Sequence, residues 1–321
     1  MNIREMKKID LHAHLNGTVS TQIFIELCNK FDIDIPNGFD LNSDLQVLNK
    51  VGSLIEYFKP WDIFKKLPIG YECLTVMVKS AFENLKKDNV SYIEFRNSPF
   101  YISKINGISL EEALVWLIES IKEQSYLYDI NARLILSLTR HELLEVNVNQ
   151  LLEAIRKVNT DNVIVGVDMS GNEDTKLPYS IEKFFLRAKE DLGLGITIHA
   201  GETGNHENVE WAIKNCGAMR IGHGSAAVKS ENLLNLIIEK DICLEVCLIS
   251  NLRTGYVQGI EEHPLKVFLE WDIPFVLCTD NPSVHGASLS DEYTLFLNHF
   301  KRADILEKMY ERNNKYSFWR G

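Results

Sequence analysis

Short runs of apolar and β-branched residues alternate along the chain with longer stretches in which apolar positions recur every three or four residues. The short runs predict buried strands, and the longer stretches predict amphipathic helices. Eight strand-like runs occur, at residues 7–15, 90–99, 130–140, 162–171, 195–202, 219–224, 243–251 and 273–282. Helical stretches lie between most of them, including 150–158, 180–192, 209–216, 231–240 and 263–271.

This alternation of strands and helices predicts parallel pairing through right-handed crossovers. Eight such units predict a closed (β/α)8 barrel, the TIM-barrel class. The first crossover, about residues 16–89, is unusually long and contains helical stretches at 21–31, 54–64 and 71–87. An insertion at that place lies on the catalytic face of a barrel and can act as a lid. No low-complexity linker or internal repeat interrupts the chain, so we expect one domain over residues 1–321.

The chain carries 34 Lys and Arg against 45 Asp and Glu, a net charge of −11. Such a charge repels a phosphate backbone, so we expect a small-molecule substrate and no nucleic-acid partner. No apolar run approaches the ~18–20 residues of a membrane span, and the opening MNIREMKKID lacks the apolar segment of a secretion signal. The six cysteines form no CxxC pair, which favours reduced thiols, and Cys243, Cys247 and Cys278 lie in apolar runs that favour buried structural thiols. We therefore expect a cytoplasmic protein without a membrane partner; the pattern does not specify an oligomeric state.

Four of the nine histidines fall within or at the end of predicted strands. His12 and His14 share one face of the first strand, because side chains two residues apart in a strand point the same way. His199 ends the fifth strand, His223 ends the sixth, and Asp280 lies at the end of the eighth. In a barrel the C-terminal strand ends converge on one pocket. Imidazoles and a carboxylate gathered there suit zinc or a similar divalent ion.

Each of these residues also has a plainer interpretation. A single histidine at a strand end is more often a hydrogen-bonded structural residue than a metal ligand, and Asp10, deeper on the face of His12, is expected to be structural. Five coincident placements at strand ends favour the metal site instead. The sequence has no P-loop, no dinucleotide-binding fingerprint and no cytidine-deaminase zinc motif, which removes three competing chemistries.

With these residues in place, the sequence resembles the adenosine deaminase family of the amidohydrolase superfamily. The HAGE, GHG and TD blocks are the most specific part of the resemblance. The matching blocks follow the family order along nearly the whole chain: KIDLHAHLNGT (8–18), SLIEYFKPW (53–61), YIEFRNSP (92–99), VGVDMSGNE (165–173), ITIHAGE (196–202), RIGHG (220–224), CLISN (247–251), HPLKVFLE (263–270) and CTDNP (278–282).

The resemblance implies a site with one zinc ion per chain. It makes the zinc ligands His12, His14, His199 and Asp280. Binuclear relatives bridge their ions with a carboxylated lysine on the fourth strand, whereas this strand ends in DMSG, so one metal is expected.

The resemblance also implies a set of catalytic and substrate-binding residues. Glu202 would protonate the purine ring, and His223 would orient or deprotonate the metal-bound water. The backbone N–H of Gly171 would contact the purine. Asp280 would belong to the catalytic set, and His14 would also contact the substrate. Addition of hydroxide to an aromatic ring is costly unless the adjacent nitrogen is protonated, which explains the need for an acid such as Glu202.

Three further positions bear on the substrate. Asn16 stands where many adenosine deaminases carry an aspartate near the ribose 5′ end, and HAHLNG is similar to the deaminases of N6-methyl-AMP. Asn281 replaces a carboxylate that contacts the purine N7, and its amide can still donate a hydrogen bond. Trp61 belongs to one apolar face of the stretch 54–64, which the resemblance places over the pocket mouth.

We therefore expect zinc-dependent hydrolytic deamination of the 6-amino group of adenosine or a related adenine nucleoside. The alternative substrates are an N6-modified AMP, adenine and a 5′-substituted adenosine, so the expected partner is a purine nucleoside or nucleotide. A different metal-dependent hydrolase and an inactive binding barrel are the remaining alternatives. Fold alone does not separate them, whereas an acid at position 202 favours deamination.

Overall fold

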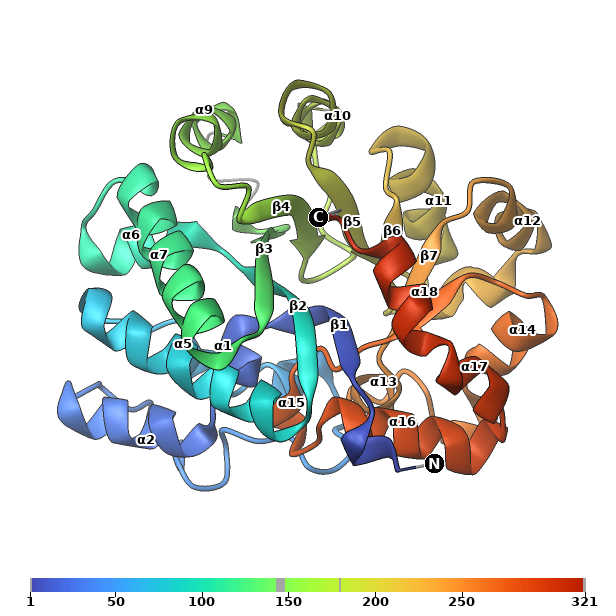
Figure 1. Ribbon diagram of the computed structural model, residues 1–321, viewed down its shortest axis with the longest axis horizontal. Helices are drawn as coiled ribbons and strands as arrows, with labels where there is room; N and C mark the ends of the chain where they lie inside the picture. Colours follow the sequence, from blue (N-terminus) through green and yellow to red (C-terminus); the bar gives the residue numbers. More distant parts are fainter. Residues whose placement is uncertain (1, 143–147, 179, 320–321) are drawn as a thin grey trace.

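The computed structural model describes residues 2–142, 148–178 and 180–319. At its centre, eight parallel strands follow one another in sequence order around a barrel (Figure 1). They are β1 (Lys8–His14), β2 (Val90–Asn97), β3 (Asn131–Thr139), β4 (Ile164–Ser170), β5 (Gly195–Ala200), β6 (Arg220–His223), β7 (Cys243–Val246) and β8 (Phe275–Leu277). All eight expected strands are confirmed, and the fold is a (β/α)8 TIM barrel.

Helices surround the strands on the outside of the barrel (Figure 1). The insertion after β1 contains α1 (Leu15–Thr18), α2 (Thr21–Lys30), α3 (Leu54–Tyr57), α4 (Trp61–Phe64) and α5 (Gly70–Lys87). The remaining helices are α6 (Pro99–Asn106), α7 (Leu110–Tyr128), α9 (Val148–Val158), α10 (Ser180–Leu192), α11 (His206–Asn215), α12 (Glu231–Glu239), α13 (Leu248–Arg253), α14 (Leu265–Glu270), α15 (Pro282–His285), α16 (Leu289–Phe300), α17 (Ala303–Glu307) and α18 (Met309–Tyr316). The helices cover the outer face of the strands, which explains why the strands read as nearly continuous apolar runs.

The backbone around Asp280 joins the two ends of the strand order. Asp280 N–H donates to the carbonyl of His12 at 2.8 Å, and His14 N–H donates to the carbonyl of Asp280 at 2.8 Å. The loop after β8 therefore runs beside the C-terminal end of β1. Residues some 270 positions apart in sequence are thereby fixed next to each other.

Two expected elements differ from the structure. The stretch 54–64 is not one helix but two short ones, α3 and α4, because Pro60 lacks an N–H and its ring clashes with the preceding turn. The run 243–251 is a strand only as far as Val246, and its second half forms α13. Short apolar runs fit strand and helix equally well. Here the buried carboxylate of Glu292 accepts the N–H groups of Leu248 and Ile249, and it thereby fixes the start of the helix.

Phe318, close to the C-terminal end of the described chain, closes the N-terminal end of the barrel. Figure 1 shows the segment after α18 running toward the strands, near β5. A Cβ atom on Gly195 would lie 2.2 Å from Cγ of Phe318, and one on Gly166 would lie 2.8 Å from its Cδ2. The guanidinium of Arg220 lies 3.7 Å from the centre of the Phe318 ring. The two glycines therefore make the space that this aromatic ring occupies.

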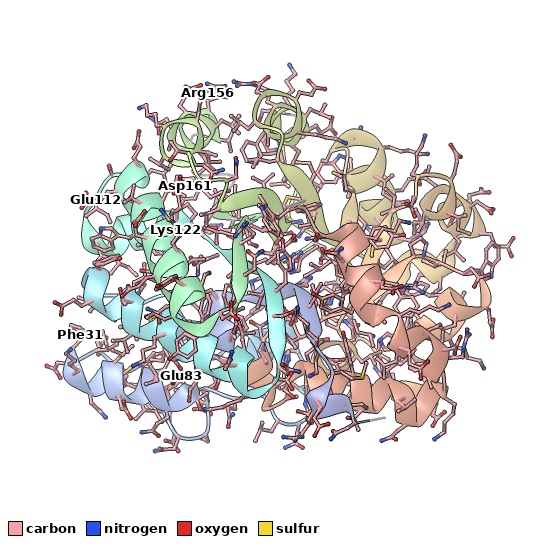
Figure 2. The ribbon with its side chains drawn as sticks, viewed as in Figure 1. Phe31, Glu83, Glu112, Lys122, Arg156 and Asp161 are labelled. Carbon is pink, nitrogen blue, oxygen red and sulfur yellow. The ribbon has the colours of Figure 1, made fainter. Side chains whose placement is uncertain are left out.

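The outer faces of the helices carry most of the charge. Glu112 and Arg156 point away from the barrel, and Lys122 pairs with Asp161 at 2.5 Å on the rim (Figure 2). All six cysteines are free and buried, including Cys243, Cys247 and Cys278, for which burial was expected. Among the described residues, no helix is both long and apolar enough to cross a membrane.

Candidate metal centre and active site

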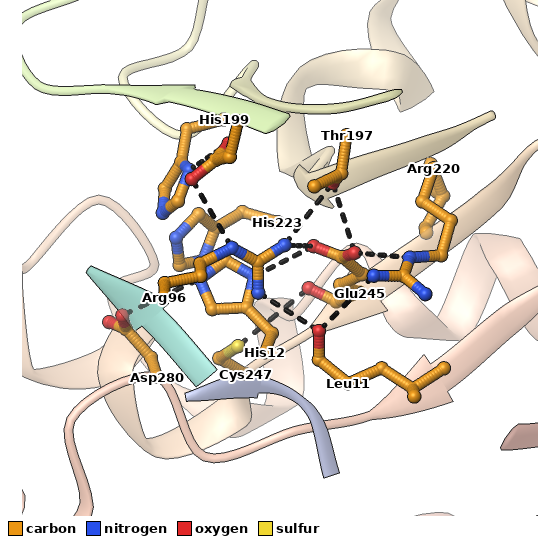
Figure 3. Close-up of polar contacts among 12 residues, drawn as sticks. Leu11, His12, Arg96, Thr197, His199, Arg220, His223, Glu245, Cys247 and Asp280 are labelled. Carbon is orange, nitrogen blue, oxygen red and sulfur yellow. Dashed lines mark hydrogen bonds and ion pairs between the residues drawn. The ribbon is translucent and has the colours of Figure 1, made fainter. Parts of the chain in front are cut away.

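Four histidines and one aspartate meet at the C-terminal end of the barrel. His12 and His14 come from β1, His199 from β5 and His223 from the end of β6, while Asp280 follows β8. The ring of His12 lies at the middle of this cluster, with ring centroids 4.5 to 5.6 Å from those of the other three histidines. The structure thus brings together every residue that the sequence placed at strand ends for metal chemistry. Figure 3 shows four of them, His12, His199, His223 and Asp280.

The donor atoms lie at distances that suit one ion. Nε2 of His14 lies 3.2 Å from Nε2 of His199 and 3.3 Å from Oδ1 of Asp280. Nε2 of His12 lies 3.6 Å from the same oxygen. Ligands about 2.0–2.2 Å from a tetrahedral zinc stand roughly 3.3–3.5 Å apart. The measured distances match that spacing.

The group of donor atoms that lie closest together differs by one residue from the predicted set of zinc ligands. The donor atoms of one group in the described chain all lie within 4.8 Å of one another: those of His12, His199, His223 and Asp280. This group contains His223 where the sequence predicts His14 as a ligand. Contacts of His14 with His199 and Asp280 nevertheless keep it within the cluster.

An orphaned nitrogen supports the metal-site interpretation. His12 is fully buried, and its Nε2 has no hydrogen-bond partner among the described residues. Burying a polar atom without a partner costs about 1–3 kcal/mol. A metal ion at the centre of the cluster would give this nitrogen a partner, so the residues present fit such an ion.

Two buried carboxylates orient the imidazoles from behind. Nδ1 of His12 lies 2.8 Å from Oε2 of Glu245, and Nδ1 of His199 lies 2.9 Å from Oδ1 of Asp168. Each carboxylate accepts the Nδ1 proton, so each Nε2 lone pair faces the centre of the cluster. Sequence reasoning missed both partners, although an acidic residue inside an apolar strand is a recognisable signal.

Arg96 connects these two carboxylates, and Figure 3 shows its contact with Glu245. Its Nη2 lies 2.5 Å from Oε2 of Glu245, and its Nε lies 3.2 Å from Oδ2 of Asp168. Burial by itself would raise the pKa of Glu245, but the charges of Arg96 and Arg220 outweigh it and hold that pKa well below its usual range. Both carboxylates are therefore charged hydrogen-bond acceptors.

Glu202 and His223 lie together on one side of the cluster. Oε2 of Glu202 is 3.8 Å from Nε2 of His223. Burial raises the pKa of Glu202, the nearby Asp280 raises it further, and His223 opposes the rise. Both His223 and Asp280 have φ of 63°, the left-handed region that non-glycine residues rarely adopt. Strained backbone of this kind is concentrated at functional sites.

A cavity of about 480 Å³ opens beside the cluster. Its lining includes the predicted substrate-binding residues His14, Asn16, Trp61, Gly171 and Asn281, together with Glu202, His223 and Asp280. Gly171 has φ of 87°, a conformation that favours glycine. Drug-sized ligands commonly occupy cavities of about 300–1,000 Å³.

The insertion supplies one wall of this cavity. Tyr57 is buried, and its hydroxyl lies 3.3 Å from Oδ2 of Asp280 and 2.9 Å from Nε2 of His285. Phe58 and Trp61 line the same wall, and Phe58 keeps 38% of its surface exposed. The predicted placement of Trp61 beside the pocket is therefore observed, on a helix shorter than expected.

Comparison with known proteins agrees with this geometry. The adenosine deaminase family model matches residues 7–318. An adenosine deaminase of Clostridium acetobutylicum is 33% identical over 307 residues, covering 94% of this chain and 90% of the relative. The structure of an Arabidopsis N6-mAMP deaminase is similar, with 27% identity, a TM-score of 0.83 and coverage of 99% of this chain and 95% of that one. The structure of Arabidopsis ADAL complexed with IMP has 26% identity, a TM-score of 0.81 and coverage of 99% and 93%. This chain therefore belongs to the adenosine deaminase family and is a hydrolytic deaminase.

Proposed function

We propose that the protein catalyses zinc-dependent removal of the 6-amino group of adenosine or a closely related adenine nucleoside. One observation carries this proposal: a largely buried carboxyl, Glu202, stands beside the His and Asp cluster in a cavity large enough for a nucleoside. Hydrolysis of an ester or lactone does not require an acid placed to protonate a ring. Glu202 therefore favours deamination over the other metal-dependent hydrolyses.

The donor set favours zinc held by His12, His14, His199 and Asp280. Imidazole nitrogens and one carboxylate oxygen are typical ligands of a catalytic zinc. When bound, zinc would supply a Lewis acid that lowers the pKa of water to about 7. Glu245 and Asp168 would hold the first and third of these ligands in the orientation that binding needs.

Glu202 supplies the proton that the purine requires. As the water oxygen bonds to C6, the electron pair of the C6–N1 double bond moves to N1, which takes the carboxyl proton of Glu202. The C6–N6 bond then breaks and C6 keeps the oxygen as a carbonyl. One proton of the attacking water leaves with N6 as ammonia, and the other restores the carboxyl of Glu202. Burial favours the protonated form of Glu202 before the reaction, which suits an acid of this kind.

Other residues of the cavity hold the purine in position. The backbone N–H of Gly171 and the side-chain amide of Asn281 are the donors we assign to the ring nitrogens, and both residues line the cavity. Trp61 and Phe58 cover its wall with apolar surface, which excludes water from the ring. Nε2 of His223 lies 3.8 Å from Oε2 of Glu202, so both groups would act at the same end of the purine.

A second candidate substrate is an N6-modified AMP. Asn16 is neutral and lines the cavity, and the Arabidopsis N6-mAMP deaminase is a relative of this chain. Two observations favour the nucleoside instead. The curated relative with 33% identity is an adenosine deaminase, and the carboxylates of Asp62 and Glu142 line the cavity, where they would repel a phosphate.

Turnover of a substrate panel tests this proposal. Zinc-loaded protein is incubated with adenosine, deoxyadenosine, adenine, AMP, N6-methyl-AMP and 5′-substituted adenosines, and the released amine and the 6-oxopurine are quantified. We expect the highest kcat/KM with adenosine or deoxyadenosine. A higher kcat/KM with N6-methyl-AMP would establish the second candidate, and no amine from any substrate would refute deamination.

A further inference from the structure

A line of hydrogen bonds runs from the backbone of α14 to His223. The N–H of Leu265 donates to Nδ1 of His263 at 3.0 Å. Nε2 of His263 lies 3.3 Å from Oδ1 of Asn251, and Nδ2 of Asn251 lies 3.1 Å from Nδ1 of His223. The side chains of Asn251, His263 and His223 are all buried, so water does not compete for these contacts.

The donor and the acceptor of each hydrogen bond in this line follow from the backbone N–H of Leu265 at its start. A backbone N–H is always a donor, so Nδ1 of His263 must accept. A neutral imidazole carries one proton, which places the proton of His263 on Nε2. That proton points to Asn251, so the amide oxygen of Asn251 faces His263 and its NH2 faces His223. Nδ1 of His223 is therefore an acceptor.

The surroundings of His263 support this order. Burial, together with the nearby His299 and His223, lowers the pKa of His263 to about 3. His263 is thus neutral at physiological pH, as the direction of the bonds requires.

We propose that Asn251 and His263 are positioning residues that hold His223 as the neutral tautomer with its proton on Nε2. Nε2 is the atom that faces Glu202 at 3.8 Å. His223 then donates a hydrogen bond to the oxygen that adds to C6, instead of taking a proton from water. Sequence reasoning left both roles open for His223. The catalytic consequence rests on the proposed function, whereas the tautomer itself does not.

Nitrogen-15 NMR of histidine-labelled, zinc-loaded protein reports the tautomer directly. The signals of His223 are assigned by their loss in His223→Gln. We expect the Nε2–H tautomer in the wild-type chain. In Asn251→Asp the carboxylate can only accept, so the proton of His223 should move to Nδ1. His263→Phe frees the amide to rotate and should give a mixture of the two tautomers.

Kinetics of the same variants connect the tautomer to turnover. A group that stabilises a developing oxyanion contributes about 10²–10³ in kcat. Asn251→Asp should therefore lower kcat by that factor, with zinc content retained and KM changed less. His206→Gln, which alters a histidine at the start of α11, outside this line of hydrogen bonds, serves as the control and should change neither readout.

The Nδ1–H tautomer in the wild-type protein would overturn the proposal, as would an unchanged His223 spectrum in Asn251→Asp. If Asn251→Asp does not fold, the wild-type spectrum decides alone. Absence of deamination with an Nε2–H tautomer would refute the proposed function and leave the positioning of His223 standing.

Discussion

The two ends of the barrel both bury charged and titratable groups, but they arrange them in opposite ways. At the N-terminal end, Arg220 lies 2.6 Å from Oε2 of Glu94 and 2.7 Å from Oε1 of Glu245, and the N–H of Phe318 donates to Glu94 at 2.6 Å. At the C-terminal end, imidazole nitrogens and a carboxylate oxygen face one another, and Nε2 of His12 has no partner among the described residues. Paired charges stabilise a fold, whereas convergent lone pairs form a binding site.

Glu245 contacts residues at both ends of the barrel. Its contacts show how the charged pairs at the N-terminal end support the site at the C-terminal end. Its Oε1 accepts from Arg220, and its Oε2 contacts His12 at 2.8 Å and Arg96 at 2.5 Å. The carboxylate is fixed by two arginines on one side, so it can fix an imidazole on the other. If this division is right, changes at the C-terminal end should abolish activity in a folded protein, and changes at the N-terminal end should mainly cost stability.

The largest effect is expected for the ligands themselves. His12→Ala and Asp280→Ala should each remove most of the zinc and reduce turnover to near background, because a catalytic site with three or four ligands loses most of its affinity with one of them. Elemental analysis and the amine-release assay measure both quantities. The matched control is His206→Ala, at a half-buried histidine at the start of α11. Full metal and activity in both ligand variants would place the metal site elsewhere.

Glu202→Gln should keep zinc and fold while lowering kcat by roughly 10²–10⁴-fold, because an amide cannot deliver a proton to N1. A raised pKa also implies a direction with pH: the protonated acid is lost, and activity falls, as pH rises through the pKa of Glu202. Glu207→Gln, on the exposed first turn of α11, is the matched control. Near-normal turnover of Glu202→Gln at neutral pH would exclude the mechanism proposed above.

A substitution at the N-terminal end of the barrel should lower stability and leave activity nearly unchanged. Phe318→Ala removes a ring that fills the space above Gly166 and Gly195 and lies against Arg220, and it should lower the free energy of unfolding by about 2–4 kcal/mol. Urea unfolding measures this loss, and kcat per zinc should stay close to that of the wild type. Tyr126→Ala, at a side chain that is 88% exposed, should change stability by less than about 0.5 kcal/mol. Loss of zinc from Phe318→Ala without loss of stability would contradict the division between the two ends.

The C-terminal end was far easier to predict from the sequence than the N-terminal one. His12, His14, His199, His223 and Asp280 each stand at a strand end, and barrel geometry alone brings such positions together. The strands were recognisable because strands buried on both faces are apolar throughout.

The other features depend on neighbours that are distant in sequence. The pairing of Glu245 with His12 joins β7 to β1, and no local pattern encodes it. Nothing in the local sequence distinguishes Phe318 from other aromatic residues, because its ring fits a space left by Gly166 and Gly195, which are more than 100 residues earlier in the chain. The start of α13 was missed for the same reason, since a carboxylate more than 40 residues later, Glu292, receives its first N–H groups.

The smallest effect on adenosine turnover is expected at Asn16, on the wall of the cavity. Its Oδ1 accepts hydrogen bonds from Nδ2 of Asn97 at 3.3 Å and from the hydroxyl of Tyr101 at 3.2 Å. An aspartate accepts both bonds equally well, so Asn16→Asp changes the charge of the cavity while its shape is kept. Adenosine is uncharged, and its kcat/KM should stay within a few-fold of the wild-type value.

A 5′-phosphorylated substrate should respond much more strongly to the same change. A carboxylate 4 Å from a phosphate charge repels it by about 4 kcal/mol at an effective dielectric near 20, before salt screening. Any kcat/KM for AMP or N6-methyl-AMP should therefore fall sharply in Asn16→Asp, and the loss should shrink as salt is added. Asn42→Asp adds the same charge to an exposed position of the insertion and should leave both substrates unaffected. An equal loss for adenosine and for the phosphorylated substrates would show that Asn16 supports the cavity wall through Asn97 and Tyr101 and does not select the 5′ group.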